Sequence, residues 1–138
     1  MLEKHKTTRE FLHFDLARNG QPYITVPGGA KMPFTLSINK CSGMSYSNNT
    51  ITITDSSISL IRVYANIGGS SDSKQVWVRI VLNDSDYATA INEGTYVNAT
   101  VETLIPVKKG DQIYCYPNGN LYAGSGGLQN FMFVERIV

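Results

Sequence analysis

The sequence contains 138 residues, of which 42% are hydrophobic and 17% are charged. This length suits one ordinary domain, and the balance of residue types excludes a disordered tail and a membrane protein. The formal net charge is +1 and the basic residues are not clustered, so we expect no nucleic-acid partner. We therefore expect one domain over residues 9–138, preceded by an N-terminal segment, residues 1–8.

The N-terminal third of the domain is predicted to form strands at a sheet edge. Apolar and polar side chains alternate over 10–16, and Asn19 with Gly20 favours a turn. Two further extended segments are predicted over 21–26 and 32–40. Proline cannot donate a hydrogen bond to a β-ladder, so three residues place this region at an edge: Pro22, Pro27 and Pro33.

A hairpin is predicted next, with strands over 44–46 and 50–54. Asn48 and Asn49 stand at its tip, and asparagine tolerates the left-handed backbone that a tight hairpin turn requires. Thr and Ile alternate in the second strand, which indicates one buried face and one face in contact with water.

Two longer strands are predicted over 58–67 and 76–82. Between them, the Gly, Ser and Asp residues of 68–73 indicate a mobile polar loop. The second strand is the most apolar of the chain, and we expect its Trp77, the sole tryptophan, to lie in the core.

The last part of the chain is predicted to form strands over 87–91, 96–105, 112–116 and 128–138, separated by turns rich in Gly, Asn and Asp. Helical periodicity is nearly absent throughout. Eight to ten short strands are about what a two-sheet jelly roll uses. The fold class we predict is therefore all-β, an antiparallel two-sheet jelly-roll sandwich.

The two cysteines, Cys41 and Cys115, leave two interpretations open. A disulfide would link the first half of the chain to a late strand. Two buried free thiols are the preferred interpretation, because the first residues lack the apolar run of a signal peptide and the protein is expected to be made in a reducing cytosol.

We expect no enzyme activity. The only imidazoles are His5 and His13, and no Ser, Cys or carboxylate stands at a motif spacing that would couple to them. An enzyme that uses the sandwich as a scaffold is the remaining alternative, and it would require His13 hydrogen-bonded to a carboxylate in a cleft.

The order of motifs resembles that of a known superfamily. Gly110 and Asp111 form the most specific piece, because glycine supplies a turn and the aspartate bonds local backbone N–H groups where the chain re-enters the sheet. The motifs follow one another over 42–53, 57–67, 78–83, 104–115 and 131–133. In this order the chain resembles the C1q and tumour necrosis factor (TNF) superfamily over about residues 40–138, which implies a C1q/TNF-like jelly roll.

This resemblance implies self-association as a homotrimer. In superfamily trimers the inner sheet places aromatic side chains along the three-fold axis, so Tyr114, Tyr116, Phe131 and Phe133 are the candidates for trimer interface or core. Some superfamily heads also hold calcium through loop oxygens. We prefer solvated turn carboxylates for the four candidates, and so expect neither metal nor cofactor: Asp72, Asp84, Asp86 and Asp111.

Loops at one end of a jelly roll normally carry binding specificity. Here they are predicted over 68–74, 83–87 and 117–127. Aromatic rings beside amide donors suit both sugar and protein surfaces, which gives four candidate ligand-contact residues: Tyr87, Asn118, Asn120 and Tyr122.

Short Asn-, Ser-, Thr- and Tyr-rich domains of this kind look like capsid decorations, head fibres or baseplate parts of bacteriophages, and like domains found on bacterial spore surfaces. The expected function is thus that of a homotrimeric virion structural protein, made in the host cytoplasm and located in the virion, whose residues 1–8 attach it to other virion proteins. The alternative is a carbohydrate- or receptor-binding head that contacts a host-surface glycan. No membrane partner is expected.

Overall fold

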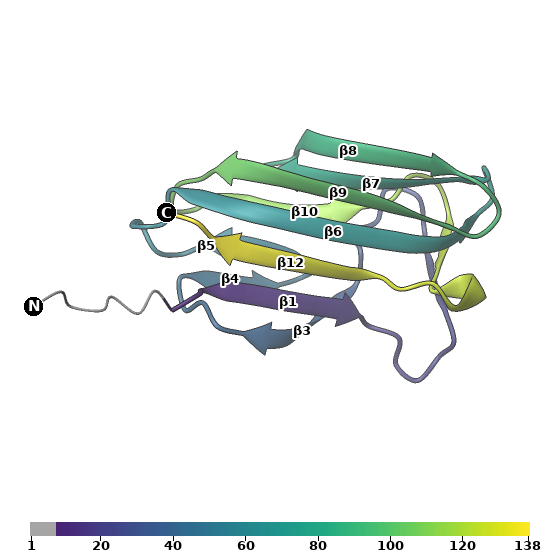
Figure 1. The fold of residues 1–138 in the computed structure, drawn as a ribbon, viewed down its shortest axis with the longest axis horizontal. Helices are drawn as coiled ribbons and strands as arrows, with labels where there is room; N and C mark the ends of the chain where they lie inside the picture. The colour runs from purple at the N-terminus through teal and green to yellow at the C-terminus, as the bar shows by residue number, and fades with distance from the viewer. Residues whose placement is uncertain (1–7) are drawn as a thin grey trace, which may run out of the picture.

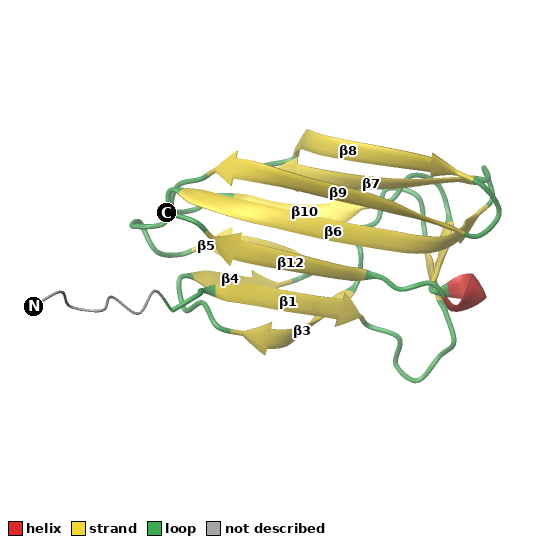
Figure 2. Ribbon diagram, in the orientation of Figure 1, coloured by secondary structure: helices red, strands yellow, loops and turns green. Residues whose placement is uncertain are grey.

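The computed structural model describes residues 8–138, so the predicted attachment segment, residues 1–8, lies outside the described residues except for Thr8. The described residues form twelve strands and one short 3-10 turn, η1 (Ser125–Gly127). The strands make two antiparallel sheets that face each other (Figures 1 and 2). The predicted all-β two-sheet sandwich is confirmed. No helix in residues 8–138 has the length and apolar character needed to span a bilayer.

The two sheets have simple orders. The seven-stranded sheet follows the path β2 (Ile24–Val26), β11 (Leu121–Ala123), β6 (Leu60–Ser71), β12 (Phe131–Arg136), β1 (Phe11–Leu16) and β3 (Phe34–Asn39), and β9 (Val97–Pro106) also pairs with β6. The five-stranded sheet has the order β4 (Met44–Ser47), β5 (Thr50–Ile53), β10 (Gln112–Tyr116), β7 (Gln75–Leu82) and β8 (Ser85–Glu93).

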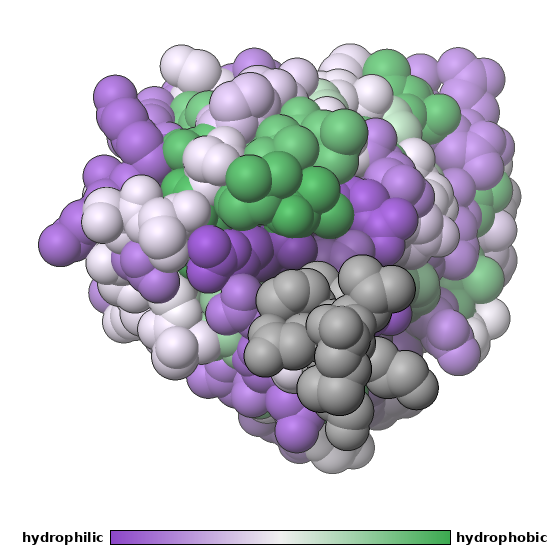
Figure 3. Space-filling view, turned by 60° about the vertical axis from the view of Figure 1, so that its left-hand side comes forward, coloured by the Kyte–Doolittle hydropathy of each residue, from purple (hydrophilic) through white to green (hydrophobic). Residues whose placement is uncertain are grey.

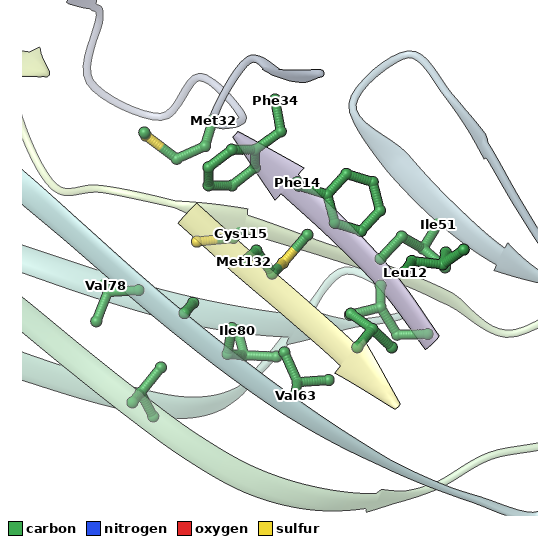
Figure 4. Close-up of a cluster of buried hydrophobic side chains, with 14 of the residues drawn as sticks. Leu12, Phe14, Met32, Phe34, Ile51, Val63, Val78, Ile80, Cys115 and Met132 are labelled. Carbon is green, nitrogen blue, oxygen red and sulfur yellow. The ribbon is translucent and has the colours of Figure 1, made fainter. Parts of the chain in front are cut away.

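The core lies between the sheets and is built by side-chain alternation. Leu12 and Phe14 of β1 are fully buried, as are Ile113 of β10 and Ile80 of β7. Figure 4 shows Leu12 and Phe14 of one sheet and Ile80 of the other within this cluster of buried side chains. Because successive side chains of a strand point to opposite faces, each strand that supplies the core also presents a second set of side chains to the outside.

Two predictions about the first half of the chain are confirmed. β4 and β5 form the predicted hairpin, and Asn48 and Asn49 at its tip have φ angles of 52° and 57°. The three prolines lie close to β2 and β3, which stand at the two ends of the path through the seven-stranded sheet. A strand at a sheet edge tolerates the missing N–H of proline.

The polar loop predicted over 68–73 is wrong in its first part, because β6 continues through Ser71. Gly69 allows the backbone of β11 to approach: a Cβ added there would lie 2.2 Å from the carbonyl oxygen of Tyr122. The side chain of Asn130 pairs with both the N–H and the C=O of Gly68, at 2.9 Å each. Glycine at these positions allows the strands to pack closely. In the sequence, a strand end of this kind has the same composition as a flexible loop.

Two other differences from the prediction concern β11 and Trp77. β11 has only three residues and was not predicted, because a strand this short between turn residues has too few positions to show alternation. Trp77 was expected in the core, but Val76 and Val78 take the inward positions and Trp77 points outward, half-buried. The alternation of β7 decides this, since neighbouring residues cannot share a face.

Asp111 performs the role predicted for it. Its side chain is buried, and its carboxylate accepts hydrogen bonds from the backbone N–H of Lys108 at 2.9 Å and from the side-chain amide of Asn83 at 2.9 Å. It therefore ties the turn before β10 to the turn between β7 and β8.

Candidate functional site

The structure divides the four residues predicted for the trimer interface or core into two pairs. Tyr114 and Tyr116 lie on the outer face of the five-stranded sheet, and Phe131 and Phe133 lie on the outer face of the seven-stranded sheet. All four are half-buried and none belongs to the core cluster. Because the sandwich core separates the two faces, the pairs belong to different surfaces of one chain.

The outer face of the seven-stranded sheet carries a group of stacked rings, which we call the aromatic face: Phe11, His13, Tyr64, Phe131 and Phe133. Ring centroids of Phe11 and Phe133 are 5.2 Å apart, and those of Tyr64 and Phe131 are 5.6 Å apart with planes inclined by 19°. The rings come from β1, β12 and β6, which are neighbours in the sheet. Three strands distant in sequence thus build one surface.

Compensated charges lie beside the aromatic face. Glu135 accepts hydrogen bonds from Arg9 at 2.6 Å and from Arg62 at 2.8 Å. The Arg62 guanidinium also lies 3.6 Å from Glu102. Leu104, on the adjoining strand β9, is 52% exposed. The surface is therefore mainly aromatic and aliphatic, and its arginines are already paired.

The outer face of the five-stranded sheet differs because its rings are bound to polar partners. The hydroxyl of Tyr116 donates to Asp86 at 2.8 Å and accepts a hydrogen bond from Arg79 at 2.9 Å. The hydroxyl of Tyr114 donates to Asp84 at 3.4 Å, and partial burial together with this carboxylate raises the pKa of Tyr114. The Arg79 guanidinium stacks on the ring of Trp77, 4.6 Å from its centroid.

The predicted ligand-contact residues also fall into two places. Asn118 and Asn120 lie in the turn after β10, and Tyr122 follows in β11. Tyr87 lies within β8 instead of a loop, and its hydroxyl donates to the carbonyl oxygen of Leu104 at 3.1 Å. Since β7 and β10 are antiparallel, the turn that precedes Tyr87 lies at the end of the sandwich opposite to residues 117–120.

Four side chains meet at the end of the sandwich where residues 117–120 lie, and we call them the tip cluster: Tyr23, Asp72, Asn120 and Tyr122. Asp72 accepts hydrogen bonds from the Tyr122 hydroxyl at 2.8 Å and from the Asn120 amide at 3.3 Å. The hydrogen bond from the Tyr122 hydroxyl to Asp72 and the charge of Asp72 raise the pKa of Tyr122. Tyr23, 47% exposed, meets the edge of the Tyr122 ring at 6.3 Å.

Sequence reasoning considered Asp72 only as a calcium ligand and as part of the predicted loop 68–74, and it gave Tyr23 no role. Asp72 and Tyr23 stand about 50 and 100 residues before Tyr122 along the chain, and only the pairing of β2 with β11 and of β11 with β6 brings them together. No spacing in the sequence signals such a contact.

A cleft of about 530 Å³ opens where β1 ends and β12 begins. Its walls include His13, Asp15, Arg18, Gln129 and Phe131. His13 Nε2 lies 3.3 Å from Asp15 Oδ1, so the contact that the enzyme alternative required is present.

A nucleophile at this histidine is not found. The hydroxyl of Ser37 donates to Asp15 Oδ2 at 2.6 Å, and no hydroxyl or thiol of residues 8–138 is hydrogen-bonded to His13. A hydrolytic triad needs the histidine between the nucleophile and the acid, whereas here the acid stands between the serine and the histidine. His13, Asp15 and Ser37 therefore do not have the order of such a triad.

The turn carboxylates considered for calcium are engaged by other side chains. Asp72, Asp84 and Asp86 each accept a hydrogen bond from a tyrosine hydroxyl, and Asp111 accepts one from Asn83. Within the described part of the chain, no three His, Cys, Asp or Glu side chains gather in a geometry that would hold a metal ion.

Cys41 and Cys115 are buried and unpaired, which agrees with the free-thiol interpretation. Burial raises the pKa of both thiols. Protonated, enclosed thiols are poor nucleophiles, so neither cysteine is placed for chemistry.

Comparisons with known proteins identify the fold. No protein-family model and no curated protein sequence matches the chain. Among solved structures, murine APRIL at pH 5.0 matches with a TM-score of 0.76 and 8% identity, over 94% of this chain and 100% of that one. Eiger TNF from S. frugiperda matches with a TM-score of 0.76 and 10% identity, over 94% of this chain and 93% of that one. The sandwich is therefore a TNF-like jelly roll.

Proposed function

We propose that the protein is a homotrimeric structural component of a bacteriophage virion, attached through its N-terminal segment and acting by binding and assembly. The observation that carries the proposal is the aromatic face of the seven-stranded sheet. Interfaces between subunits are enriched in aromatic residues and arginine at the expense of unpaired charge, and this surface has that composition.

The two outer faces differ in a way that favours this one for assembly. Phe11, Phe131 and Phe133 have no polar group, and the Tyr64 hydroxyl makes no hydrogen bond to another residue of 8–138. On the five-stranded sheet, Trp77, Tyr114 and Tyr116 all bond to polar side chains of the same chain. Burying the first surface gains apolar contact without breaking internal hydrogen bonds.

Trimerisation is the mode of assembly that the fold favours, since superfamily heads pack as homotrimers through one sheet. In the present chain, the aromatic face spans β1, β12 and β6 at the middle of that sheet. A closed ring of three copies would bury much of this face and leave the five-stranded sheet outward.

The arrangement of the chain ends supports attachment at one end. β1 begins and β12 ends on the same side of the molecule, while η1 and the turns next to the tip cluster lie on the opposite side (Figure 1). On the first side, Ile137 and Val138 are 44% and 60% exposed, and Figure 3 shows hydrophobic atoms gathered there. A partner bound at this end would leave the tip facing outward.

Analytical ultracentrifugation tests the assembly. The wild-type chain is expected to sediment at close to three times 15.2 kDa. Phe133→Glu places a charge on the aromatic face and is expected to yield folded monomers, whereas the matched Tyr114→Glu on the other sheet should stay trimeric. A monomeric wild-type protein, or two variants with the same mass, would reject the proposed interface.

Immunogold electron microscopy tests the location. Antibody against the chain is expected to label phage particles released by the producing cells, at regular positions on the head, fibre or baseplate. Labelling of cell debris with bare particles would reject a virion role while leaving the assembly result intact.

A receptor- or glycan-binding head is the second candidate, and the tip cluster favours it. Asp72 keeps unused acceptor positions beside the second amide hydrogen of Asn120, an arrangement suited to adjacent sugar hydroxyls. Tyr23 adds an exposed ring. A glycan array should then show binding that Tyr122→Ala abolishes and Tyr87→Ala preserves. A blank array, or equal binding by Tyr122→Ala, would remove this candidate.

A further inference from the structure

Arg18 differs from the other arginines of the chain. Arg9, Arg62, Arg79 and Arg136 each lie within 4.0 Å of a carboxylate oxygen. Arg18 has no carboxylate within that distance among residues 8–138; its guanidinium donates only to the carbonyl oxygens of Pro22 and Leu128. Carbonyl groups orient the guanidinium but leave its full positive charge uncompensated.

The half-buried charge of Arg18 lines the cleft at the end of β1. A partly desolvated cation without a counter-ion is costly, and an anion that enters the cleft would recover part of that cost. The two backbone contacts already hold the guanidinium in place, so little side-chain freedom remains to be lost on binding.

The other walls of the cleft define the rest of the ligand. Asp15 accepts one hydrogen bond from Ser37 and contacts His13, which leaves acceptor positions for hydroxyl donors. The Gln129 side chain makes no hydrogen bond to another residue of 8–138 and can both donate and accept. The His13 and Phe131 rings, stacked 6.2 Å apart, offer an apolar wall.

We infer that this cleft binds a hydroxylated carboxylate of the size and chemistry of an acidic sugar. The carboxylate pairs with Arg18, the hydroxyls bond to Asp15 and Gln129, and the C–H face of the ring packs on Phe131. A cleft of about 530 Å³ lies within the range of small-molecule sites and is ample for one or two sugar rings.

This site is separate from the tip cluster and goes beyond the proposed assembly. His13 and Phe131 also belong to the aromatic face, so the cleft opens at the border of that surface. Ligand binding and trimer formation are nevertheless independent measurements, and sedimentation of each sample alongside the binding experiment distinguishes failure of one from failure of the other.

Saturation-transfer NMR with D-galacturonic acid tests the inference. The matched ligand D-galactose carries a hydroxymethyl group in place of the carboxylate, and acetate supplies the carboxylate without the ring. Galacturonate is expected to bind with a Kd on the order of 1 mM, as suits a monosaccharide, and the other two should bind at least roughly tenfold more weakly. Equal binding of galactose or acetate, or no binding of galacturonate, would overturn the inference.

Two variants separate ligand binding from a purely structural role of Arg18. Arg18→Gln is expected to weaken galacturonate binding roughly tenfold or more, because a charge-assisted hydrogen bond is lost, and to lower Tm as well. Gln129→Ala removes a side chain without internal bonds and should weaken binding while leaving Tm unchanged. Arg79→Gln, on the outer face of the five-stranded sheet and outside the cleft, should leave affinity unaltered. A structural role alone predicts unchanged affinity in Gln129→Ala, which would overturn the assignment.

Discussion

The hydroxyl of Tyr122 donates to a carboxylate oxygen of Asp72, 2.8 Å away, although 50 residues separate them in the chain. Asp72 lies in the turn after β6, and Tyr122 lies in β11, which pairs with the last residues of β6. The contact organises the tip cluster, since the same carboxylate also holds the Asn120 amide.

Replacing the carboxylate should therefore change the titration of Tyr122. We predict that Asp72→Asn lowers the pKa of Tyr122 toward its ordinary value, because both the hydrogen bond to the carboxylate and the nearby negative charge are lost. NMR of the tyrosine ring carbons during a pH titration measures this. Tyr114, whose raised pKa has other causes, is the internal control. An unchanged Tyr122 titration would show that the contact does not persist in solution.

Gly69 is expected to be far less replaceable than other glycines with positive φ. A Cβ at Gly69 would lie 2.2 Å from the backbone oxygen of Tyr122, so Gly69→Ala must separate β11 from β6. We predict a loss of about 3 kcal/mol or more in the free energy of unfolding. Gly29 also has a positive φ, but the space around it is open, so Gly29→Ala should lower the free energy of unfolding by about 1 kcal/mol. Equal losses in urea unfolding would contradict this account of the strand.

Tyr46 is expected to make stability depend on alkaline pH. Burial raises its pKa from 10.0 to about 12, so the folded state prefers the neutral phenol. The contribution of the neutral Tyr46 phenol to the free energy of unfolding is complete below pH 10 and is lost as the pH rises toward 12. Tyr46→Phe should therefore show a smaller fall in the free energy of unfolding over this interval than the wild type.

The same variant should cost about 1 kcal/mol at neutral pH, where the hydrogen bond from Tyr46 to the Phe34 carbonyl is lost. Urea unfolding at both pH values compares the two chains. Parallel stability curves across the alkaline interval would show that other groups cause the whole pH dependence.

Both cysteines should behave as enclosed free thiols. Burial keeps Cys41 and Cys115 protonated, so a thiol reagent is expected to react slowly with the folded protein and with two groups per chain once it is unfolded. Reductant should leave Tm unchanged. A mass increase of the unfolded chain after reduction would instead reveal a disulfide.

Much of the fold followed from local pattern. Alternation in β1 and β5 predicted which side chains face the core, and Asn48 and Asn49 predicted the hairpin turn that the structure contains. Prolines located the sheet edges correctly. These features depend on residues close together in the chain, whose physical preferences act over a few positions.

The wrong predictions concern residues whose type is compatible with two different structures. Gly68 and Gly69 have the composition of a loop, yet glycine also permits strands to approach closely, and the partner of Gly69, Tyr122, stands 53 residues later. Trp77 was assigned to the core because it stands in the most apolar strand, but the phase of alternation in β7 turns it outward. Neither outcome can be read from a short window of sequence.

By itself, the sequence determined that the chain is all-β, that it forms a two-sheet sandwich and that its turns carry asparagine and aspartate. The tertiary structure alone decided which rings share a surface: it set Phe131 and Phe133 apart from Tyr114 and Tyr116 and joined Asp72 to Tyr122. It also placed Arg18 in a cleft with no carboxylate of residues 8–138 within ion-pair distance. The physical reason is that strand order and register are set by contacts between distant segments, and a surface exists only after those segments have been placed side by side.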